Sequence, residues 1–155
     1  MRVDFYHLQK STLEQIIPVL TEKAYASGKK VLIKTDLEEK AEYLNTLLWT
    51  YKPDSWLPHG TSADGFETEQ PVLITTEESN PNKAEIVILV DGGTLEEIES
   101  FERCLNIFDG RDDAALSQAR VFWKAVVDAG HTANYWQQSD AGKWELKVSK
   151  TKEKL

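Results

Sequence analysis

The stretch IVILV, residues 86–90, consists entirely of large apolar side chains. A sheet with one solvated face has strands in which apolar and polar residues alternate, and this run does not alternate. Continuous apolar runs are typical of strands buried on both faces, as in the parallel sheets of α/β proteins. IVILV therefore predicts a central strand of an α/β sheet.

Shorter runs of β-branched and aromatic residues indicate further strands, and helical patterns separate most of them. The expected strands are residues 3–8, 31–33, 72–75 and 104–108. The expected helices follow side chains that can cap a first turn: Ser11 with Glu14, Asp36 with Glu39, Thr94 with Glu97, and the pair Asp112 and Asp113. A closing hairpin is expected across residues 140–142.

This alternation predicts a doubly wound α/β fold, with a mostly parallel central sheet and helices on both faces. The topology is Rossmann-like, although the sequence lacks the glycine fingerprint of a dinucleotide site. A chain of 155 residues suits one domain, which we place at residues 1–148. Residues 149–155 are expected to form a disordered tail.

The charge and cysteine content limit the classes of partner and compartment. A formal net charge of −8 repels phosphates, so direct DNA binding is disfavoured, and no expected helix carries a row of basic residues. The single cysteine, Cys104, cannot form an internal disulfide. The chain has no apolar run of signal-peptide or membrane-span length, so we expect a cytoplasmic protein.

The sequence offers little for catalysis or cofactor binding. His7, His59 and His131 have no metal-ligand spacing, and Cys104 lies in an apolar strand, where core packing is its expected role. We expect no metal, no cofactor and no catalysis. The alternative is a nucleotide-binding domain or small enzyme that uses the turn at residues 91–94, DGGT, which follows the IVILV strand.

Aromatic residues gather in WTYKPDSWLPH, residues 49–59, where a helix is expected to end. Rigid rings in a loop fixed by prolines suit a surface that recognises a partner. The alternative is that Trp49 and Trp56 fold back onto the core, as most tryptophans do.

The last expected helix has two neighbouring stripes. Residues 115, 119, 122, 126 and 129 form an apolar stripe, and Arg120 and Trp123 share the flank beside it, with Lys124 one turn beyond Arg120. An arginine and a tryptophan therefore share one helix flank. One interpretation is purely structural: Arg120 pairs with an acidic neighbour and Trp123 only packs the helix onto the sheet.

The order of several short motifs resembles one known family. These motifs are VDFYHL (3–8), SGKKVLI (27–33), LNTLLW (44–49), PDSWLPH (53–59), QPVLIT (70–75), FDG (108–110) and ARVFWKAVVDAG (119–130). Together they resemble the chi subunit of bacterial DNA polymerase III holoenzyme, over most of the chain to about Trp144.

The resemblance implies a non-catalytic accessory subunit of the clamp-loader assembly. Such a subunit binds the acidic, phenylalanine-terminated tail of single-stranded-DNA-binding protein and, in some bacteria, joins the clamp loader through a partner called psi. The implied tail pocket comprises Trp49, Trp56, Arg120, Trp123 and Lys124. Arginine would hold the terminal carboxylate, the rings would enclose the phenylalanine, and lysine would attract the preceding aspartates.

Two positions depart from the family pattern. Residues 109–111 form a charged turn where some relatives have apolar or aromatic residues, and Leu116 stands where a basic residue can occur. These departures predict weaker binding of the acidic tail, unless Arg111 supplies the charge. The extension that contains Tyr135, Trp136 and Trp144 also differs from relatives with a shorter tail.

Overall fold

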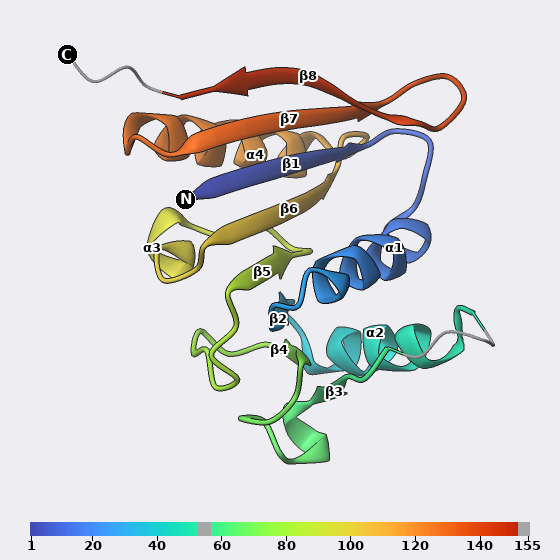
Figure 1. Cartoon of the computed structure of the whole chain (residues 1–155). Helices are drawn as coiled ribbons and strands as arrows, with labels where there is room; N and C mark the ends of the chain where they lie inside the picture. The colour runs from blue at the N-terminus through green and yellow to red at the C-terminus, as the bar shows by residue number, and fades with distance from the viewer. Residues whose placement is uncertain (53–56, 152–155) are drawn as a thin grey trace.

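The computed structural model describes residues 1–52 and 57–151 (Figure 1). Within them the strands are β1 Arg2–Leu8, β2 Val31–Lys34, β3 Gly60–Thr61, β4 Val72–Thr75, β5 Ile86–Leu89, β6 Arg103–Asp109, β7 Thr132–Gln138 and β8 Trp144–Lys150. The α-helices are α1 Leu13–Ala26, α2 Glu38–Thr50, α3 Leu95–Ile98 and α4 Asp113–Asp128, and a short 3₁₀ helix spans Ser62–Asp64.

These strands form one sheet in the order β3-β4-β2-β5-β6-β1-β7-β8. Every neighbouring pair is parallel except β7 and β8, which are antiparallel. The IVILV strand, β5, lies between β2 and β6, and its residues are buried. The predicted doubly wound, mostly parallel α/β fold and the central place of IVILV are confirmed.

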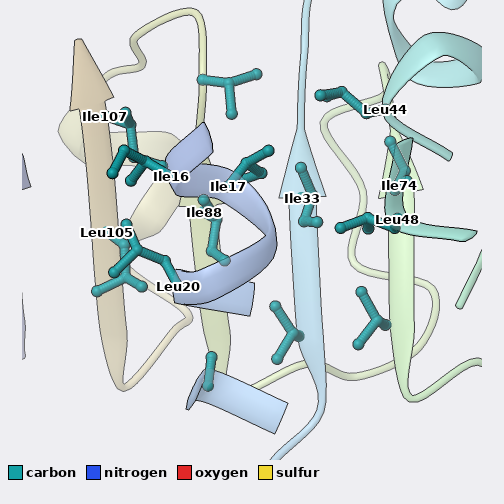
Figure 2. Packing of buried hydrophobic residues seen from close by; sticks show 14 of the residues in the cluster. Ile16, Ile17, Leu20, Ile33, Leu44, Leu48, Ile74, Ile88, Leu105 and Ile107 are labelled. Atoms are coloured by element: carbon teal, nitrogen blue, oxygen red, sulfur yellow. The ribbon is translucent and has the colours of Figure 1, made fainter. Parts of the chain in front are cut away.

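The side chains of β5 divide between two apolar layers because successive residues of a strand point to opposite faces. Ile86 and Ile88 belong to the layer under α1 and α2, and Val87 and Leu89 belong to the layer under α3 and α4. Figure 2 shows the first layer, in which Ile16, Ile17 and Leu20 of α1 and Leu44 and Leu48 of α2 cover the strands. The sheet therefore separates α1 and α2 from α3 and α4.

The helix starts differ in part from the capping predictions. Thr12, one residue after the expected Ser11, caps α1: its hydroxyl accepts from Gln15 N, and its own N–H donates to the Gln15 side chain. The prediction for α2 is wrong, because Leu37 occupies the cap position without a side-chain hydrogen bond and is 57% exposed. Before α4, Asp112 caps the helix as expected.

The third helix is also shorter than its pattern predicts. α3 is a single turn, and the Thr94 hydroxyl bonds to the Glu97 carboxylate instead of a backbone N–H.

The chain closes with the predicted hairpin of β7 and β8, whose turn contains Gly142 at a φ of 83°. β8 extends to Lys150, so Ser149 and Lys150 belong to a strand and not to the tail expected from residue 149. Residues 152–155 lie outside the described residues.

Candidate functional site

A hollow of about 520 Å³ lies between α4 and the strands β6, β1, β7 and β8. Its walls come from strands at the β8 side of the sheet and from one flank of α4. The lining residues are Phe5, His7, Phe108, Leu116, Ala119, Arg120, Trp123, Tyr135, Gln137, Val148 and Lys150. Figure 1 shows α4 behind β7 and β1, which places this hollow at the end of the sheet away from α2.

Aromatic rings form the apolar part of the hollow. Trp123 meets Phe5 edge to face at a centroid distance of 5.2 Å and meets Tyr135 in the same way at 5.9 Å. Phe108 lies 6.2 Å from Tyr135. Trp123 is only half-buried, so it packs α4 onto the sheet and also lines the hollow. The two roles proposed for it from sequence are therefore compatible.

His7 and Tyr135 are joined by a hydrogen bond between His7 Nδ1 and the tyrosine hydroxyl. Burial lowers the pKa of His7, and the nearby carboxylate of Asp109 opposes this shift without reversing it. The His7 ring also lies against Gly110, where an added Cβ atom would overlap His7 Nε2. Glycine in the FDG turn is thus required for the position of His7 and, through it, of Tyr135.

The cationic part of the hollow is Arg120, which is exposed on α4. Burial raises the pKa of Tyr135, whereas a hydrogen bond with Gln137 and the charge of Arg120 lower it by smaller amounts. Arg120 therefore acts electrostatically on the hollow. Within residues 1–52 and 57–151, it makes no ion pair, so the alternative of a local acidic partner finds no support there.

Lys124 lies outside this hollow. It lines a shallow surface next to it on α4, together with Arg120, Val121 and Asp128. A ligand that leaves the hollow past Arg120 would next meet Lys124. Arg111, the other expected source of charge, instead binds the Asp109 carboxylate at 2.8 Å and the Ser11 carbonyl at 3.3 Å.

Trp49 lies near the end of α2, on the opposite side of the sheet from α4. Trp49 is 52% exposed, and the centroid of its ring lies 4.1 Å from that of the His59 ring. His59 is buried, with Nδ1 at 2.6 Å from the Leu57 carbonyl oxygen and Nε2 at 2.9 Å from that of Asn45. Trp49 is therefore neither folded into the core nor near Arg120.

The structure does not assemble the five-residue pocket expected from sequence. Arg120, Trp123 and Lys124 share α4, but Trp49 is on the other face of the sheet. Trp56 lies outside the described residues. The separation arises because α2 packs near β3 and β4 at one edge, while α4 packs near β6 and β7.

The DGGT turn lines a second, smaller hollow of about 340 Å³ at the carboxyl ends of β5 and β6. Among the described residues, its lining includes the carboxylates of Asp36, Asp91, Asp109 and Asp112 and no lysine or arginine. Burial raises the pKa of Asp91, but hydrogen bonds from Lys40, Thr35 and the Asp36 backbone outweigh it and lower the pKa. Lys40 and Arg111 pair with some of these carboxylates, but four aspartates outnumber two cations, and the excess negative charge disfavours the phosphates of a nucleotide.

The structure also bears on a metal site, on Cys104 and on membrane-spanning helices, for the residues that it describes. Among them, no three His, Cys, Asp or Glu side chains are grouped to hold a metal ion. Cys104 is fully buried, and this burial raises the pKa of its thiol, which suits the expected role in the core. None of the helices in these residues has the length and apolar character required to cross a membrane.

Residues 1–134 match the family model described as DNA polymerase III chi subunit. The chain belongs to the DNA polymerase III chi subunit family. Chi is an accessory, non-catalytic subunit of the polymerase complex that replicates DNA, and this agrees with the prediction of a chain without catalysis of its own.

Three curated relatives carry the chi name. The probable chi subunit of Rickettsia prowazekii is 33% identical over 66% of this chain, and the chain spans 62% of that relative. The chi subunit of Haemophilus influenzae is 29% identical over 79% of this chain and 87% of its own length. That of Escherichia coli is 26% identical over 80% of this chain and 84% of its own length.

Sequence reasoning on this chi-family chain missed several residues of the hollow. His7, Tyr135, Val148 and Lys150 come from three strands that are far apart in sequence. The period-2 pattern places Phe5 and His7 on one face of β1, but it does not predict that β7 will be the neighbour of β1. Only the strand order brings these side chains to α4.

Proposed function

We propose that this chi-family chain binds the acidic C-terminal tail of single-stranded-DNA-binding protein in the hollow between α4 and the strands β6, β1, β7 and β8. One observation carries the proposal: Arg120 lines an aromatic hollow and makes no ion pair among the described residues. A terminal phenylalanine supplies the ring and the carboxylate that such a site can hold.

Each part of the peptide has a matching side chain. The guanidinium of Arg120 can hold the terminal carboxylate with two parallel hydrogen bonds. Trp123, Phe108 and Tyr135 provide ring edges and faces for the terminal phenylalanine. Lys124 lies one turn along α4, where it can attract an aspartate that precedes the terminus.

We further propose that the chain connects this tail to the clamp loader in the bacterial cytoplasm, through psi or an equivalent adaptor, and contacts DNA only indirectly. A linking protein requires two separate surfaces. Trp49, exposed on the opposite face and supported by His59, provides a second aromatic surface for the clamp-loader side. This assignment replaces the role of Trp49 in the tail pocket.

The test is fluorescence anisotropy of a labelled acidic peptide that ends in Ile-Pro-Phe. A hydrogen bond to a charged group contributes about 1.5–3 kcal/mol, so Arg120→Ala should weaken binding about 10- to 100-fold. Amidation of the peptide terminus should weaken binding to the wild-type chain by a similar factor. Moderate salt should also weaken it by screening the charges.

Trp49→Ala is the matched control, because it removes an exposed aromatic side chain from the other face. It should leave peptide affinity unchanged. The proposal fails if folded wild-type protein does not bind the peptide, or if the acid and amide forms bind equally.

A further inference from the structure

The last strand forms one wall of the hollow. Val148 and Lys150 of β8 line it opposite α4, and the match to the chi family ends at residue 134. This wall therefore comes from a part of the chain outside the family match. Neither residue was among the site residues expected from sequence.

The register of the hairpin explains why these two side chains reach the hollow. Val148 pairs with Tyr135, which lies in the hollow, and Lys150 pairs with Ala133. Directly paired residues of antiparallel strands point to the same face, as do residues two apart on one strand. Val148 and Lys150 thus extend the face of the sheet formed by Phe5 and Tyr135.

β8 is held firmly in this position at both ends. Near its start, the Trp144 ring meets Tyr6 edge to face at 5.2 Å on the other side of the sheet. Near its end, the Ser149 hydroxyl donates to Asn134 Oδ1 at 2.7 Å, and the hydroxyls of Thr132 and Thr151 are 2.8 Å apart. The wall is therefore part of the folded sheet.

The chemistry of the wall matches an acidic peptide with an apolar end. Val148 is an apolar side chain that remains 46% exposed. Lys150 makes no ion pair within residues 1–52 and 57–151, whereas Lys147 lies 3.5 Å from Glu145. Positive charge therefore borders the hollow from two sides, with Arg120 on α4 and Lys150 on β8.

We propose that β8 is the second wall of the peptide site and determines its preference for residues before the terminus. Val148 packs against the apolar end of the peptide. Lys150 pairs with a carboxylate upstream of the terminal phenylalanine, while Arg120 holds the terminal carboxylate. This inference rests on the proposed function, since it assigns further contacts to the same peptide.

The test compares Lys150→Glu with Lys147→Glu in the same anisotropy assay. Both variants make the same charge change on the same strand, but only Lys150 lines the hollow. Because exposed ion pairs are weak, Lys150→Glu should raise Kd by about three- to tenfold, and Lys147→Glu by less than about twofold. Circular dichroism checks that both variants are folded.

A second peptide, with asparagines in place of its aspartates, identifies the contact. Lys150→Glu should weaken the binding of this peptide less than that of the acidic peptide, because only the repulsion of the terminal carboxylate remains, whereas Arg120→Ala should weaken the binding of both peptides. Equal effects of the two lysine variants, or an equal loss with both peptides, would overturn the inference. If wild-type protein binds and Lys150→Glu has no effect, the inference fails and the proposed function stands; if wild-type protein does not bind, the proposed function itself fails.

Discussion

Asp4 of β1 is buried, with its side chain only 1% exposed, and ties β1 to both neighbouring strands. Its Oδ2 accepts from Arg103 Nε of β6 at 2.9 Å. Its Oδ1 accepts from Asn134 Nδ2 at 3.0 Å and from Trp136 Nε1 at 3.1 Å, both on β7. We predict that Asp4→Asn destabilises the fold although it preserves the shape of the side chain.

The size of the effect follows from the groups that lose their acceptor. Asp4 Oδ2 also lies 3.3 Å from Arg2 Nε. The asparagine amide has one oxygen, so its NH₂ group must face either the two arginines, Arg2 and Arg103, or the two donors of β7. Breaking a buried ion pair costs about 3–5 kcal/mol, and the lower end applies because the side chains of Arg2 and Arg103 are 49% and 32% exposed. A loss of about 3 kcal/mol corresponds to a fall in Tm of about 6–12 °C for a chain of this size.

Thermal and urea unfolding followed by circular dichroism measure this loss. Asp140→Asn is the matched control, because Asp140 is fully exposed and pairs only with Lys10, at 3.0 Å, among the described residues. It should change the free energy of unfolding by less than about 0.5 kcal/mol. If Asp4→Asn costs no more than this control, the argument that Asp4 anchors β7 is refuted.

Two further predictions concern the hollow. Gly110→Ala should displace His7 from Tyr135, because the added Cβ would overlap the His7 ring. We expect urea unfolding to show a destabilisation of about 1–3 kcal/mol. An unchanged urea midpoint would contradict this contact. The pKa of His7, read from the NMR titration of its ring proton, should lie below 6.5. The buried neutral imidazole should therefore stabilise the fold fully above pH 6.5, and this stabilisation should be lost as pH falls through the lowered pKa. A midpoint at or above 6.5 would show that burial does not dominate.

The sequence patterns predicted the parallel sheet well because burial on both faces leaves a direct trace in composition. IVILV became the central strand β5, and the charged and aromatic flank of α4 was visible in its helical spacing. Local hydrogen bonding was predicted less well. A side chain that can cap a helix can also bind elsewhere, and Asp36 instead lies 3.6 Å from Lys40.

The place of Trp49 could not be predicted because it depends on the order of the strands. The periodicity of α2 shows that one of its faces is buried, but not which face of the sheet it covers. The same limit applies to Tyr135, whose contact with His7 requires β7 to lie beside β1. Such contacts join residues 128 apart in the chain and leave no mark in local spacing.

The strand order also explains why the two candidate surfaces lie on opposite faces. The connections that contain α1 and α2, from β1 to β2 and from β2 to β3, move the chain toward the β3 edge of the sheet. The connections that contain α3 and α4, from β5 to β6 and from β6 to β7, move it toward the β8 edge. Right-handed connections that run in opposite directions place their helices on opposite faces of a sheet. Trp49 on α2 and Arg120 on α4 are therefore separated by the sheet itself, and substitutions at the two sites should have additive effects on binding.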